Sequence, residues 1–416
     1  MKFIINGNKK TEGSIRNSGS KNSAVAIIPA TVLAENDVTL RNVPNIQDVN
    51  TLITILREIG YQVSFSDNVL KIRKKKKIRH HIQSDEVSKL RGSYYFMGAF
   101  LGKSKKVIIK NCGGCNLGYR PINFHLEGFK KLGAKIKQYP YKIKITAKEL
   151  SGCEILLEFP SVGATINIML ASVKANGTTI IKNSAKEPEI IDVGNFLIAM
   201  GAKITGLGSD IIVIQGVKHL SGCDYKITSD RIEAGTYLIL GSISNGKGIT
   251  VKDCCPQYLT SLIELLKNIG CTVNVGINEI FVKKGQSLKP FNITTAPYPD
   301  FPTDLGQMIS VLATQIKGTS SIKETIFSNR FSHVEELQKM GANITIKGDT
   351  TFVQGENELK PAQLTAYDLR GAASLVLAAV LANGTTHIEN IDVLLRGYEK
   401  PVEKFSSLGL DIKLKE

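Results

Sequence analysis

Residues 166–185 read INIMLASVKANGTTIIKNSA, and they show the pattern from which the fold can be deduced. An apolar stretch rich in small residues, typical of a buried helix, ends at an Asn-Gly turn and is followed by a strand-like stretch. Residues 374–392 repeat the pattern as SLVLAAVLANGTTHIENID. We predict six such helix–turn–strand elements, with the small-residue helices at the centre of the protein. Related stretches begin at Ile28, Tyr94, Gly235 and Met308.

A second kind of helix follows each of these elements and ends in glycine. Examples are ITILREIG, which ends at Gly60, and IELLKNIG, which ends at Gly270. Glycine at this place supplies the left-handed residue that closes a helix. We expect these longer, lysine-bearing helices to lie outside the small-residue helices. The six glycines are Gly60, Gly133, Gly201, Gly270, Gly341 and Gly409, at intervals of 73, 68, 69, 71 and 68 residues.

Six units with these intervals indicate one βαβ-type module repeated along the chain, and hence an α/β fold. Single cores stop growing at about 250–300 residues. The 416-residue chain therefore predicts two domains of three units each, with the junction between His219 and Asp230. The first 20 residues belong to no unit. Within them, Lys2–Asn6 and Gly13–Arg16 are predicted to form two short strands around a turn that complete a sheet of one domain.

Composition narrows the class of protein. The net charge of +16 favours anionic partners, namely phosphorylated metabolites, nucleic acid or anionic lipid. No apolar run approaches the ~20 residues of a membrane span, and the start, MKFIINGNKK, lacks the apolar core of a signal peptide. Seven cysteines without the spacing of a disulfide framework predict reduced thiols and a cytoplasmic protein. The basic run at 72–81 is interpreted as a solvated turn, because no aromatic residues interleave it.

One stretch stands apart from the repeat. Residues 111–125 read NCGGCNLGYRPINFH and gather glycines around Cys115, with Arg120 following. Glycine lets the backbone bend and move, and a nearby guanidinium favours a thiolate. We predict a mobile lid that carries a reactive thiol and an anion ligand; the alternative is a surface turn with a buried cysteine. Cys112 and Cys115 also form a C-x-x-C, but no second pair has metal-binding spacing, so zinc or redox chemistry is not favoured.

Polar residues recur where the small-residue helices begin. Residues 17–22 read NSGSKN, in which Ser18 or Ser20 is a candidate helix cap. Lys21 and Asn22 follow at the helix start, where free N–H groups and the helix dipole favour an anion. The segment is therefore a candidate phosphate or carboxylate site, although an ordinary capped helix explains it equally well.

Asp304 ends the sequence FPTD at the first turn of the fifth small-residue helix. It is either an acid that complements the helix dipole or a general base. Asp368 and Arg370 hold the matching place in the sixth unit. If these helix starts converge, they line an anion-binding cleft. The matching segments elsewhere are 161–165 and 230–231, and the loop arginines that are further candidate ligands are Arg91, Arg330 and Arg396.

Together these stretches resemble the enolpyruvyl transferases over essentially the whole chain, in particular the members that use UDP-N-acetylglucosamine. The resemblance implies an inside-out α/β barrel in two domains, each of three βαβαββ units. It places the first domain at residues 21–228 and the second at residues 1–20 plus 229–416. The N-terminal hairpin is thus expected to belong to the second domain. The shared motifs are NSGSKN at 17–22, GGCNLGYRP at 113–121, PSVGAT at 160–165, EPEIID at 187–192, FPTD at 301–304, NRF at 329–331, DLR at 368–370 and RGYE at 396–399.

The resemblance also implies a reaction. The 3-hydroxyl of UDP-N-acetylglucosamine adds to the enol carbon of phosphoenolpyruvate and phosphate then leaves, at the first committed step of peptidoglycan precursor synthesis. Neither a metal nor an organic cofactor is implied. Asp304 matches the base near the hydroxyl. Cys115 matches the thiol that protonates the methylene, forms an adduct with phosphoenolpyruvate and is alkylated by fosfomycin.

The remaining matches are to residues that hold the substrates. The cationic ligands of the phosphate are matched by Lys21, Arg120 and Arg396, of which Lys21 and Arg396 also count among the catalytic residues. Residues around the reacting centre are matched by Asn22, Asp368 and Arg370, and another cationic residue of the cleft is matched by Arg330. Contacts to the UDP-sugar are implied for Arg91, Arg120, Pro121, Ile122, Asn123, Phe124, Ser161, Val162, Gly163, Asp304, Ile326 and Phe327.

Three positions depart from the family pattern, and three other functions remain as alternatives. Asn45 replaces a common lysine, Asp300 a common glycine, and Phe159 lies in a segment that often contains lysine. The first alternative is a shikimate-3-phosphate enolpyruvyl transferase, whose relatives lack the Gly-Gly-Cys lid. The second is a basic nucleic-acid-binding repeat protein, which the absence of stacking aromatics disfavours. The third is an inactive paralogue kept as a binding protein, which the retention of the five residues Cys115, Asp304, Lys21, Arg120 and Arg396 disfavours.

Overall fold

The structure is a computed structural model that describes residues 1–8, 10–74, 78–113, 121–328 and 330–416. The chain divides into two compact units. Unit 1 holds residues 1–18 and 229–416, and unit 2 holds residues 19–228 apart from those not described. In the described chain the strands form six sheets of four strands each, three in either unit.

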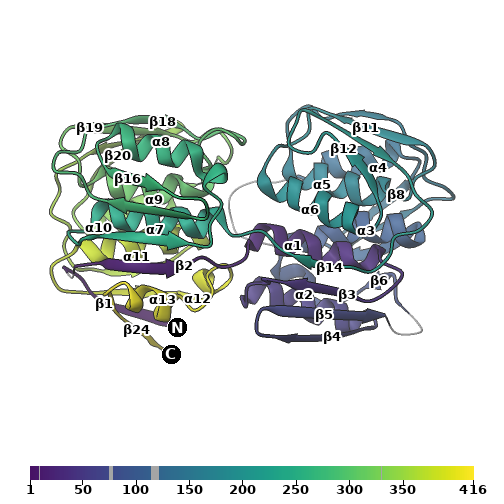
Figure 1. Cartoon of the computed structure of the whole chain (residues 1–416), viewed down its shortest axis with the longest axis horizontal. Helices are drawn as coiled ribbons and strands as arrows, with labels where there is room; N and C mark the ends of the chain where they lie inside the picture. Colours follow the sequence, from purple (N-terminus) through teal and green to yellow (C-terminus); the bar gives the residue numbers. More distant parts are fainter. Residues whose placement is uncertain (9, 75–77, 114–120, 329) are drawn as a thin grey trace. The chain divides into compact units, whose positions relative to one another are not determined.

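The third sheet of unit 2 shows the module in its simplest form. Its strand order is β10-β11-β13-β12, in which the first pair is parallel and the other pairs are antiparallel. A helix connects the parallel strands and a second helix leads to the final hairpin, which gives a βαβαββ unit (Figure 1). The elements are β10 (Glu154–Leu156), α5 (Val162–Ser172), β11 (Thr178–Lys182), α6 (Pro188–Ala199), β12 (Lys203–Thr205) and β13 (Ile211–Gln215).

The other two sheets of unit 2 follow the same plan, with orders β14-β3-β5-β4 and β6-β7-β9-β8. Their strands are β14 (Asp224–Lys226), β3 (Val38–Arg41), β5 (Val69–Lys74), β4 (Tyr61–Ser66), β6 (His81–Ile82), β7 (Lys106–Lys110), β9 (Lys142–Thr146) and β8 (Lys135–Tyr139). Their helices are α1 (Lys21–Ala30), α2 (Gln47–Glu58), α3 (Tyr95–Ser104) and α4 (Asn123–Lys131), with 3₁₀ turns η1 (Thr31–Leu33), η2 (Asp85–Lys89) and η3 (Arg91–Tyr94).

Unit 1 repeats the plan in the orders β2-β15-β17-β16, β18-β19-β21-β20 and β22-β23-β1-β24. Its strands are β2 (Glu12–Arg16), β15 (Gly248–Lys252), β17 (Glu279–Lys283), β16 (Thr272–Val275), β18 (Asn292–Thr294), β19 (Thr319–Lys323), β21 (Thr350–Gln354), β20 (Asn343–Lys347), β22 (Gln363–Thr365), β23 (Thr385–Glu389), β1 (Lys2–Asn6) and β24 (Asp411–Lys415). Its helices are α7 (Arg231–Ile243), α8 (Thr260–Asn268), α9 (Thr303–Ala313), α10 (Ser332–Lys339), α11 (Leu369–Leu381), α12 (Asp392–Leu395) and α13 (Pro401–Ser407), with the 3₁₀ turn η4 (Pro256–Leu259).

The small-residue helices form the centre of each unit, as predicted. In α7 every residue from Ile232 to Ile243 is buried, and α9 and α11 pack against each other in the same core. Helices α1, α3 and α5 hold the same place in unit 2 (Figure 1). Each large apolar side chain buried in this way contributes about 1.5–3 kcal/mol, so the layer of central helices provides much of the stability.

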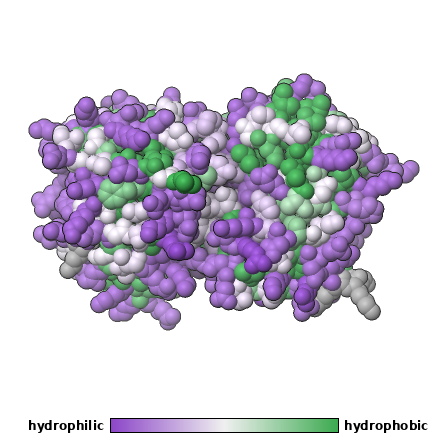
Figure 2. All heavy atoms as spheres, viewed as in Figure 1, coloured by the Kyte–Doolittle hydropathy of each residue, from purple (hydrophilic) through white to green (hydrophobic). Residues whose placement is uncertain are grey.

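The helices outside this core carry the charged residues but are not longer, which corrects the expectation. Helix α13 has 7 residues and α10 has 8, whereas the central helices α7 and α11 have 13 each. A central helix has to cross the whole core, whereas an outer helix needs only to cover one sheet. Polar residues dominate the face drawn in Figure 2, and apolar residues gather mainly over part of unit 2.

The N-terminal strands do not form a hairpin, which corrects the second expectation. Among the described pairings, β1 lies antiparallel to both β23 and β24, whereas β2 runs parallel to β15 in a different sheet. Both strands belong to unit 1, and each completes a module whose other strands lie more than 200 residues away in the sequence. In the same way, β14 at residues 224–226 supplies the first strand of the module that contains α1.

The glycines that end the outer helices have the predicted left-handed backbone. The value of φ ranges from +90° to +109° at Gly60, Gly133, Gly201, Gly270, Gly341 and Gly409. Residues with a Cβ rarely adopt this region, so the repeat of glycine reflects six equivalent helix ends. Among the described residues, no helix combines the length and hydropathy required to cross a bilayer.

Candidate active site

Asp304 lies in the first turn of α9, but it does not cap the helix. Residue Pro302 holds the cap position and makes no side-chain hydrogen bond there. The Asp304 carboxylate instead accepts from two guanidinium groups, Arg330 Nη2 at 2.6 Å on Oδ1 and Arg370 Nη2 at 2.9 Å on Oδ2. Arg370 Nε adds a third bond at 3.1 Å. The starts of α9 and α11 therefore lie together in unit 1, joined by this carboxylate.

The charges of the two arginines determine the protonation state of the Asp304 carboxyl group. Burial alone would raise the pKa of Asp304, but the positive charges of Arg370 and Arg330 outweigh burial and hold the pKa well below its usual range. Burial would likewise lower the pKa of Arg370, but the charge of Asp304 raises it overall. The arginine side chains are only 3% and 4% exposed, whereas that of Asp304 is 27% exposed. The carboxylate is thus ionised, firmly held and still reachable from solvent.

Asp368 has a different role at the start of α11. Its Oδ1 accepts the backbone N–H groups of Arg370 and Gly371, both at 3.0 Å, which makes it the helix cap. Its Oδ2 accepts from Ser332 Oγ at 2.9 Å and Gln307 Nε2 at 3.2 Å. Burial alone would raise the pKa of Asp368, but these bonds together with the charge of Arg330 lower it. Both oxygens of Asp368 are therefore engaged in holding helices α9, α10 and α11 together.

The loop after β19 carries the predicted sugar contacts Ile326 and Phe327. The Cζ atom of Arg330 lies 5.0 Å from the centroid of the Phe327 ring, within cation–π distance. The loop therefore contacts the Asp304 cluster through the ring of Phe327, which packs against Arg330. Arg396 follows α12 and is half-buried in the same unit.

Unit 2 holds the predicted residues Lys21 and Asn22 at the start of α1. Ser20 is the cap and accepts from Ser23 N at 3.2 Å, which decides between the two candidate serines. Lys21 Nζ lies 3.3 Å from Asp48 Oδ2, in a pair whose side chains are 15% and 4% exposed. Such a buried pair orients the ammonium group while leaving part of it accessible. Asn22 Nδ2 donates to Glu189 Oε1 at 3.2 Å.

A second cluster of unit 2 brings together residues from three segments. Arg91 Nη2 lies 3.5 Å from the carbonyl of Pro121, and its Cζ atom is 5.6 Å from the Tyr94 ring centroid. The Tyr94 ring is 6.3 Å from that of His125, just beyond Ile122, Asn123 and Phe124 at the start of α4.

His125 connects this cluster to α5. Burial is the main cause that lowers the pKa of His125 to about 3, so its ring is neutral. A Cβ on Gly163 would lie 2.9 Å from His125 Cε1, so any other residue at this position would require the ring to shift. Ser161 caps α5 by accepting from Ala164 N at 3.3 Å, and Val162 begins the helix.

The lid predicted at 111–125 is described only at its two ends. Cys115 and Arg120 lie outside the described residues, so both remain sequence predictions. Gly113 is described, and a Cβ on it would lie 1.7 Å from the carbonyl of Ser88, which requires glycine at that position. Burial raises the pKa of Cys112 well above its usual value, which disfavours a reactive thiolate at this cysteine.

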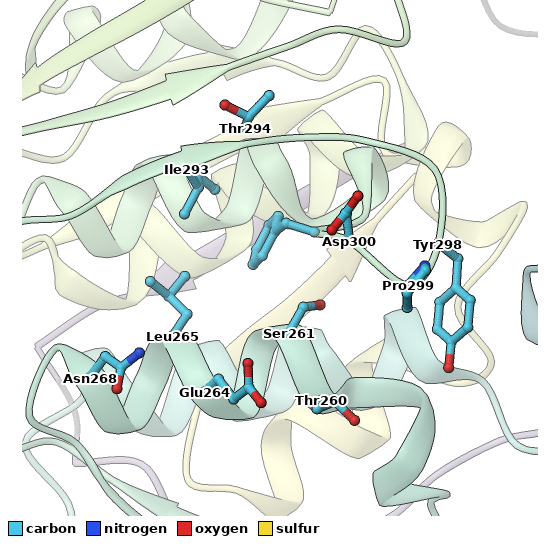
Figure 3. A pocket seen from close by; sticks show the side chains of 11 residues that line it. Thr260, Ser261, Glu264, Leu265, Asn268, Ile293, Thr294, Tyr298, Pro299 and Asp300 are labelled. Atoms are coloured by element: carbon cyan, nitrogen blue, oxygen red, sulfur yellow. The ribbon is translucent and has the colours of Figure 1, made fainter.

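A pocket of about 460 Å³ lies next to the segment that leads to Asp304. Figure 3 shows it between α8 and residues 293–301, with Leu265 and Ile293 on one side and Asp300 toward the other. Asp300, one of the departures from the family pattern, is exposed there. Asp304, Arg330 and Arg370 are not among its lining residues, so this pocket does not contain the cluster.

Several partners of the predicted residues had no signal in the sequence. They are Asp48 in unit 2 and Gln307 and Glu324 in unit 1. Two further partners, Glu189 and Thr303, lie inside the motifs EPEIID and FPTD, but the motifs do not reveal which side chains they contact. Each is an ordinary polar residue whose partner comes from another element, so spacing along the chain does not reveal it. For the residues outside these motifs, the sequence offers only the repeat, which predicts polar residues near the starts of the central helices.

The family follows from comparison with known sequences. The family described as EPSP synthase (3-phosphoshikimate 1-carboxyvinyltransferase) matches residues 5–405, so the chain belongs to this family of enolpyruvyl transferases. Within it, the chain is 46% identical over 411 residues to UDP-N-acetylglucosamine 1-carboxyvinyltransferase 2 of Listeria monocytogenes serotype 4b, covering 99% of this chain and 97% of the relative. The protein of the same name from Oceanobacillus iheyensis is 46% identical over 412 residues, with 99% and 96% covered.

Solved structures confirm the α/β fold of six repeated units. The enolpyruvyl transferase NikO from Streptomyces tendae superposes with a TM-score of 0.91, covering 99% of this chain and 98% of that chain at 24% identity. EPSP synthase from Acinetobacter baumannii superposes with a TM-score of 0.77 over 100% of both chains at 19% identity. At these identities the likeness establishes the fold and no more.

Proposed function

We propose that this protein transfers the enolpyruvyl group of phosphoenolpyruvate to the 3-hydroxyl of UDP-N-acetylglucosamine and releases phosphate. The observation that carries the proposal is the 46% identity over 99% of the chain to a protein named UDP-N-acetylglucosamine 1-carboxyvinyltransferase 2. The reaction would serve the synthesis of peptidoglycan precursors, for which the enolpyruvyl sugar is the committed intermediate.

The same observation weighs against shikimate 3-phosphate as the acceptor. The relatives named for the UDP-sugar are 45–46% identical to this chain, whereas the solved EPSP synthases are 19–20% identical. The sequence GGC at 113–115 also distinguishes the chain from that alternative. The chain belongs to a family of enzymes, and the anionic substrates explain its net charge of +16 directly. The nucleic-acid-binding alternative is therefore not needed to explain that charge.

In the proposed reaction Asp304 accepts the proton of the sugar hydroxyl as the oxygen attacks the enol carbon. A carboxylate whose pKa is lowered by two arginines is a weak base in this state. Phosphoenolpyruvate carries a carboxylate and a phosphate, which compete with Asp304 for the guanidinium groups of Arg330 and Arg370. We expect that competition to weaken the arginine contacts and to raise the pKa of Asp304 as the substrates bind.

The other residues keep the roles that the family resemblance gives them. Cys115 gives its proton to the methylene carbon, and the tetrahedral intermediate then loses phosphate and one proton of the methyl group so formed, which returns to the Cys115 thiolate. Lys21, Asn22, Arg120 and Arg396 bind phosphoenolpyruvate. Asp368 and Arg370 are proposed near the reacting centre, and the contacts of Asp368 assign it to holding the helix starts. The proposed contacts to the UDP-sugar are Arg91, Arg120, Pro121, Ile122, Asn123, Phe124, Ser161, Val162, Gly163, Asp304, Ile326 and Phe327.

Two further statements belong to the same proposal. Fosfomycin is proposed to alkylate Cys115, because an epoxide reacts with a thiolate and the family resemblance places that thiol in the lid. The protein is proposed to work in the cytoplasm, where both nucleotide sugar and phosphoenolpyruvate are available and where its seven cysteines stay reduced.

The test is phosphate release from phosphoenolpyruvate with UDP-N-acetylglucosamine, with shikimate 3-phosphate as the control acceptor. We expect release only with the UDP-sugar, and we expect Cys115→Ala to weaken it. Release that the variant does not alter would remove Cys115 from its role and leave the function in place. Release with neither acceptor would contradict the proposed function and favour an inactive binding protein or a nucleic-acid-binding protein, which a salt-sensitive mobility shift on RNA or DNA would reveal.

A further inference from the structure

The carboxylate of Glu324 is buried at the end of β19 and has three described donors. Its Oε1 accepts the backbone N–H groups of Ile326 at 2.8 Å and Phe327 at 3.1 Å. Its Oε2 accepts from the hydroxyl of Thr303 at 2.7 Å. The residue is only 7% exposed. Burial of a carboxylate costs free energy unless hydrogen-bond donors surround it. The three donors therefore stay close to the carboxylate, which fixes the orientation of the two backbone amides and of the Thr303 hydroxyl.

Those contacts lead to two different parts of the candidate site. On one side are the backbone groups of Ile326 and Phe327, in the loop proposed to bind the UDP-sugar. On the other side Thr303 Oγ1 accepts from Arg330 Nη1 at 2.8 Å, and Arg330 Nη2 donates to Asp304 at 2.6 Å. All of these residues belong to unit 1.

We propose that Glu324 is a positioning residue that sets the orientation of the sugar-binding loop relative to the Arg330–Asp304 pair. The inference rests on the proposed function and deepens it, because the acceptor hydroxyl must meet Asp304 in a fixed orientation. Glu324 acts through Thr303 on the proton-accepting side and through two backbone amides on the binding side. A glutamate side chain suits this place, since its two oxygens accept from all three donors and it offers no competing N–H group.

The rest of the loop is anchored independently, which makes the role of Glu324 separable. Thr325 N donates to Thr295 Oγ1 at 3.2 Å, and the Thr325 hydroxyl donates to the Thr295 carbonyl at 2.5 Å. The loop would therefore remain attached without Glu324. What it would lose is the orientation of the two following peptide groups and the link to Arg330.

The experiment compares steady-state kinetics of five variants with the wild-type protein, using phosphoenolpyruvate and UDP-N-acetylglucosamine. Thr303→Val removes the hydroxyl that connects Glu324 to Arg330 and leaves the bonds from Glu324 to the loop in place. We therefore expect kcat to fall about 10- to 100-fold, with KM for the UDP-sugar changed less than about threefold. Thr303→Ser keeps the hydroxyl and should recover most of that loss. Glu324→Ala removes both links and should also raise KM for the UDP-sugar about tenfold, and Glu324→Gln should give an intermediate effect.

Glu336→Gln is the matched control. Glu336 is 1% exposed, accepts the backbone N–H of Thr365 at 2.9 Å, pairs with Lys339 and lies in the same unit. Among the described residues proposed for the site, none is its hydrogen-bond or ion-pair partner. We expect it to lower stability as much as Glu324→Gln and to leave kcat and KM within about twofold of wild type. Thermal unfolding of every variant separates loss of fold from loss of orientation.

Each outcome decides the inference. The predicted split between kcat and KM, with recovery by serine, supports it. Kinetics of Thr303→Val and Glu324→Gln equal to those of the Glu336→Gln control overturn it while the proposed function stands. If the Glu324 variants fail to fold, the valine and serine variants of Thr303 decide alone, because equal kcat values for the two contradict the link. A wild-type protein that releases no phosphate with the UDP-sugar overturns the proposed function and this inference with it.

Discussion

Asp304 and Asp368 occupy nearly the same place in neighbouring repeats of unit 1, but their carboxylates do different things. Asp368 precedes α11 and accepts two backbone N–H groups of that helix. Asp304 lies inside the first turn of α9 and binds Arg330 and Arg370. Asp368 is 4% exposed, whereas the side chain of Asp304 is 27% exposed. A shift of two residues relative to the helix cap therefore changes the role of the acid.

The cause of the difference lies at the helix cap. Four of the six central helices have a side-chain cap, namely Ser20, Ser161, Asp230 and Asp368. At α9 the cap position is occupied by Pro302, which has no side-chain acceptor. The carboxylate of Asp304, two residues after the cap, binds the arginines instead of the helix N–H groups. A repeat protein can in this way assign one helix start to chemistry while the equivalent starts stabilise the fold.

The largest expected effect comes from Asp304→Asn. The substitution keeps the shape but removes the proposed proton acceptor, and the activity should fall about 10²- to 10⁴-fold. The matched variant Asp368→Asn keeps an efficient capping side chain and should lose at most about tenfold. Phosphate release with UDP-N-acetylglucosamine measures both. Similar losses for the two variants would abolish the distinction between the two acids.

Whereas Asp304→Asn should have its main effect on activity, Asp368→Ala should have its main effect on stability. It leaves two backbone N–H groups, Gln307 and Ser332 without their acceptor, at an expected cost of about 2–4 kcal/mol. Urea unfolding followed by circular dichroism gives the change in free energy. Asp368→Asn, which restores a cap, is the control and should recover more than half of the loss. A change below about 1 kcal/mol for the alanine variant would show that the cap is not needed.

Lowering the pH from 7.5 to 5 should destabilise the protein through two buried histidines rather than through these acids. The pKa values of Asp304 and Asp368 are lowered, so both stay ionised in this range and their contribution is lost only below about pH 4. Burial is the main cause that lowers the pKa of His125 to about 3 and that of His333 to about 4.

The sign follows from proton binding. Below about pH 6.5 the unfolded chain protonates these histidines and the folded chain does not, so each costs about 2 kcal/mol at pH 5. Unfolding free energies at the two pH values measure the loss, which His125→Gln and His333→Gln should each reduce. His219→Gln is the control, because the His219 side chain is 81% exposed. Equal stability at both pH values would contradict the prediction.

The smallest expected effect concerns a hydroxyl cap, which sharpens the contrast with Asp368. Ser20 accepts one backbone N–H at the start of α1, so Ser20→Ala should cost about 1 kcal/mol. Ser20→Asn retains an acceptor and should cost less than half as much. Thermal unfolding of the two variants is a sufficient measurement. A loss for alanine as large as that for Asp368→Ala would mean that the two caps differ only in position.

Much of the fold was predictable because it depends on local pattern. The spacing of glycines and of small-residue stretches gave six modules, and the left-handed glycines and buried central helices agree with it. The division into domains at 21–228 and 1–20 plus 229–416 and the roles of the site residues remain predictions. The prediction of an N-terminal hairpin was wrong, because β1 and β2 pair with strands far along the chain.

The sequence by itself determined the module, its number and the family, because periodic burial and motif spacing are properties of neighbouring residues. Only the tertiary structure decided which strands complete each sheet and whether Asp304 caps its helix or binds arginines. It also revealed the links from Glu324 to Thr303 and from Lys21 to Asp48. Both the strand pairing and these links are contacts between residues tens to hundreds of positions apart. The free energy of such a contact depends on the burial and the charges around it in the folded chain, which the spacing of residues along the sequence does not define.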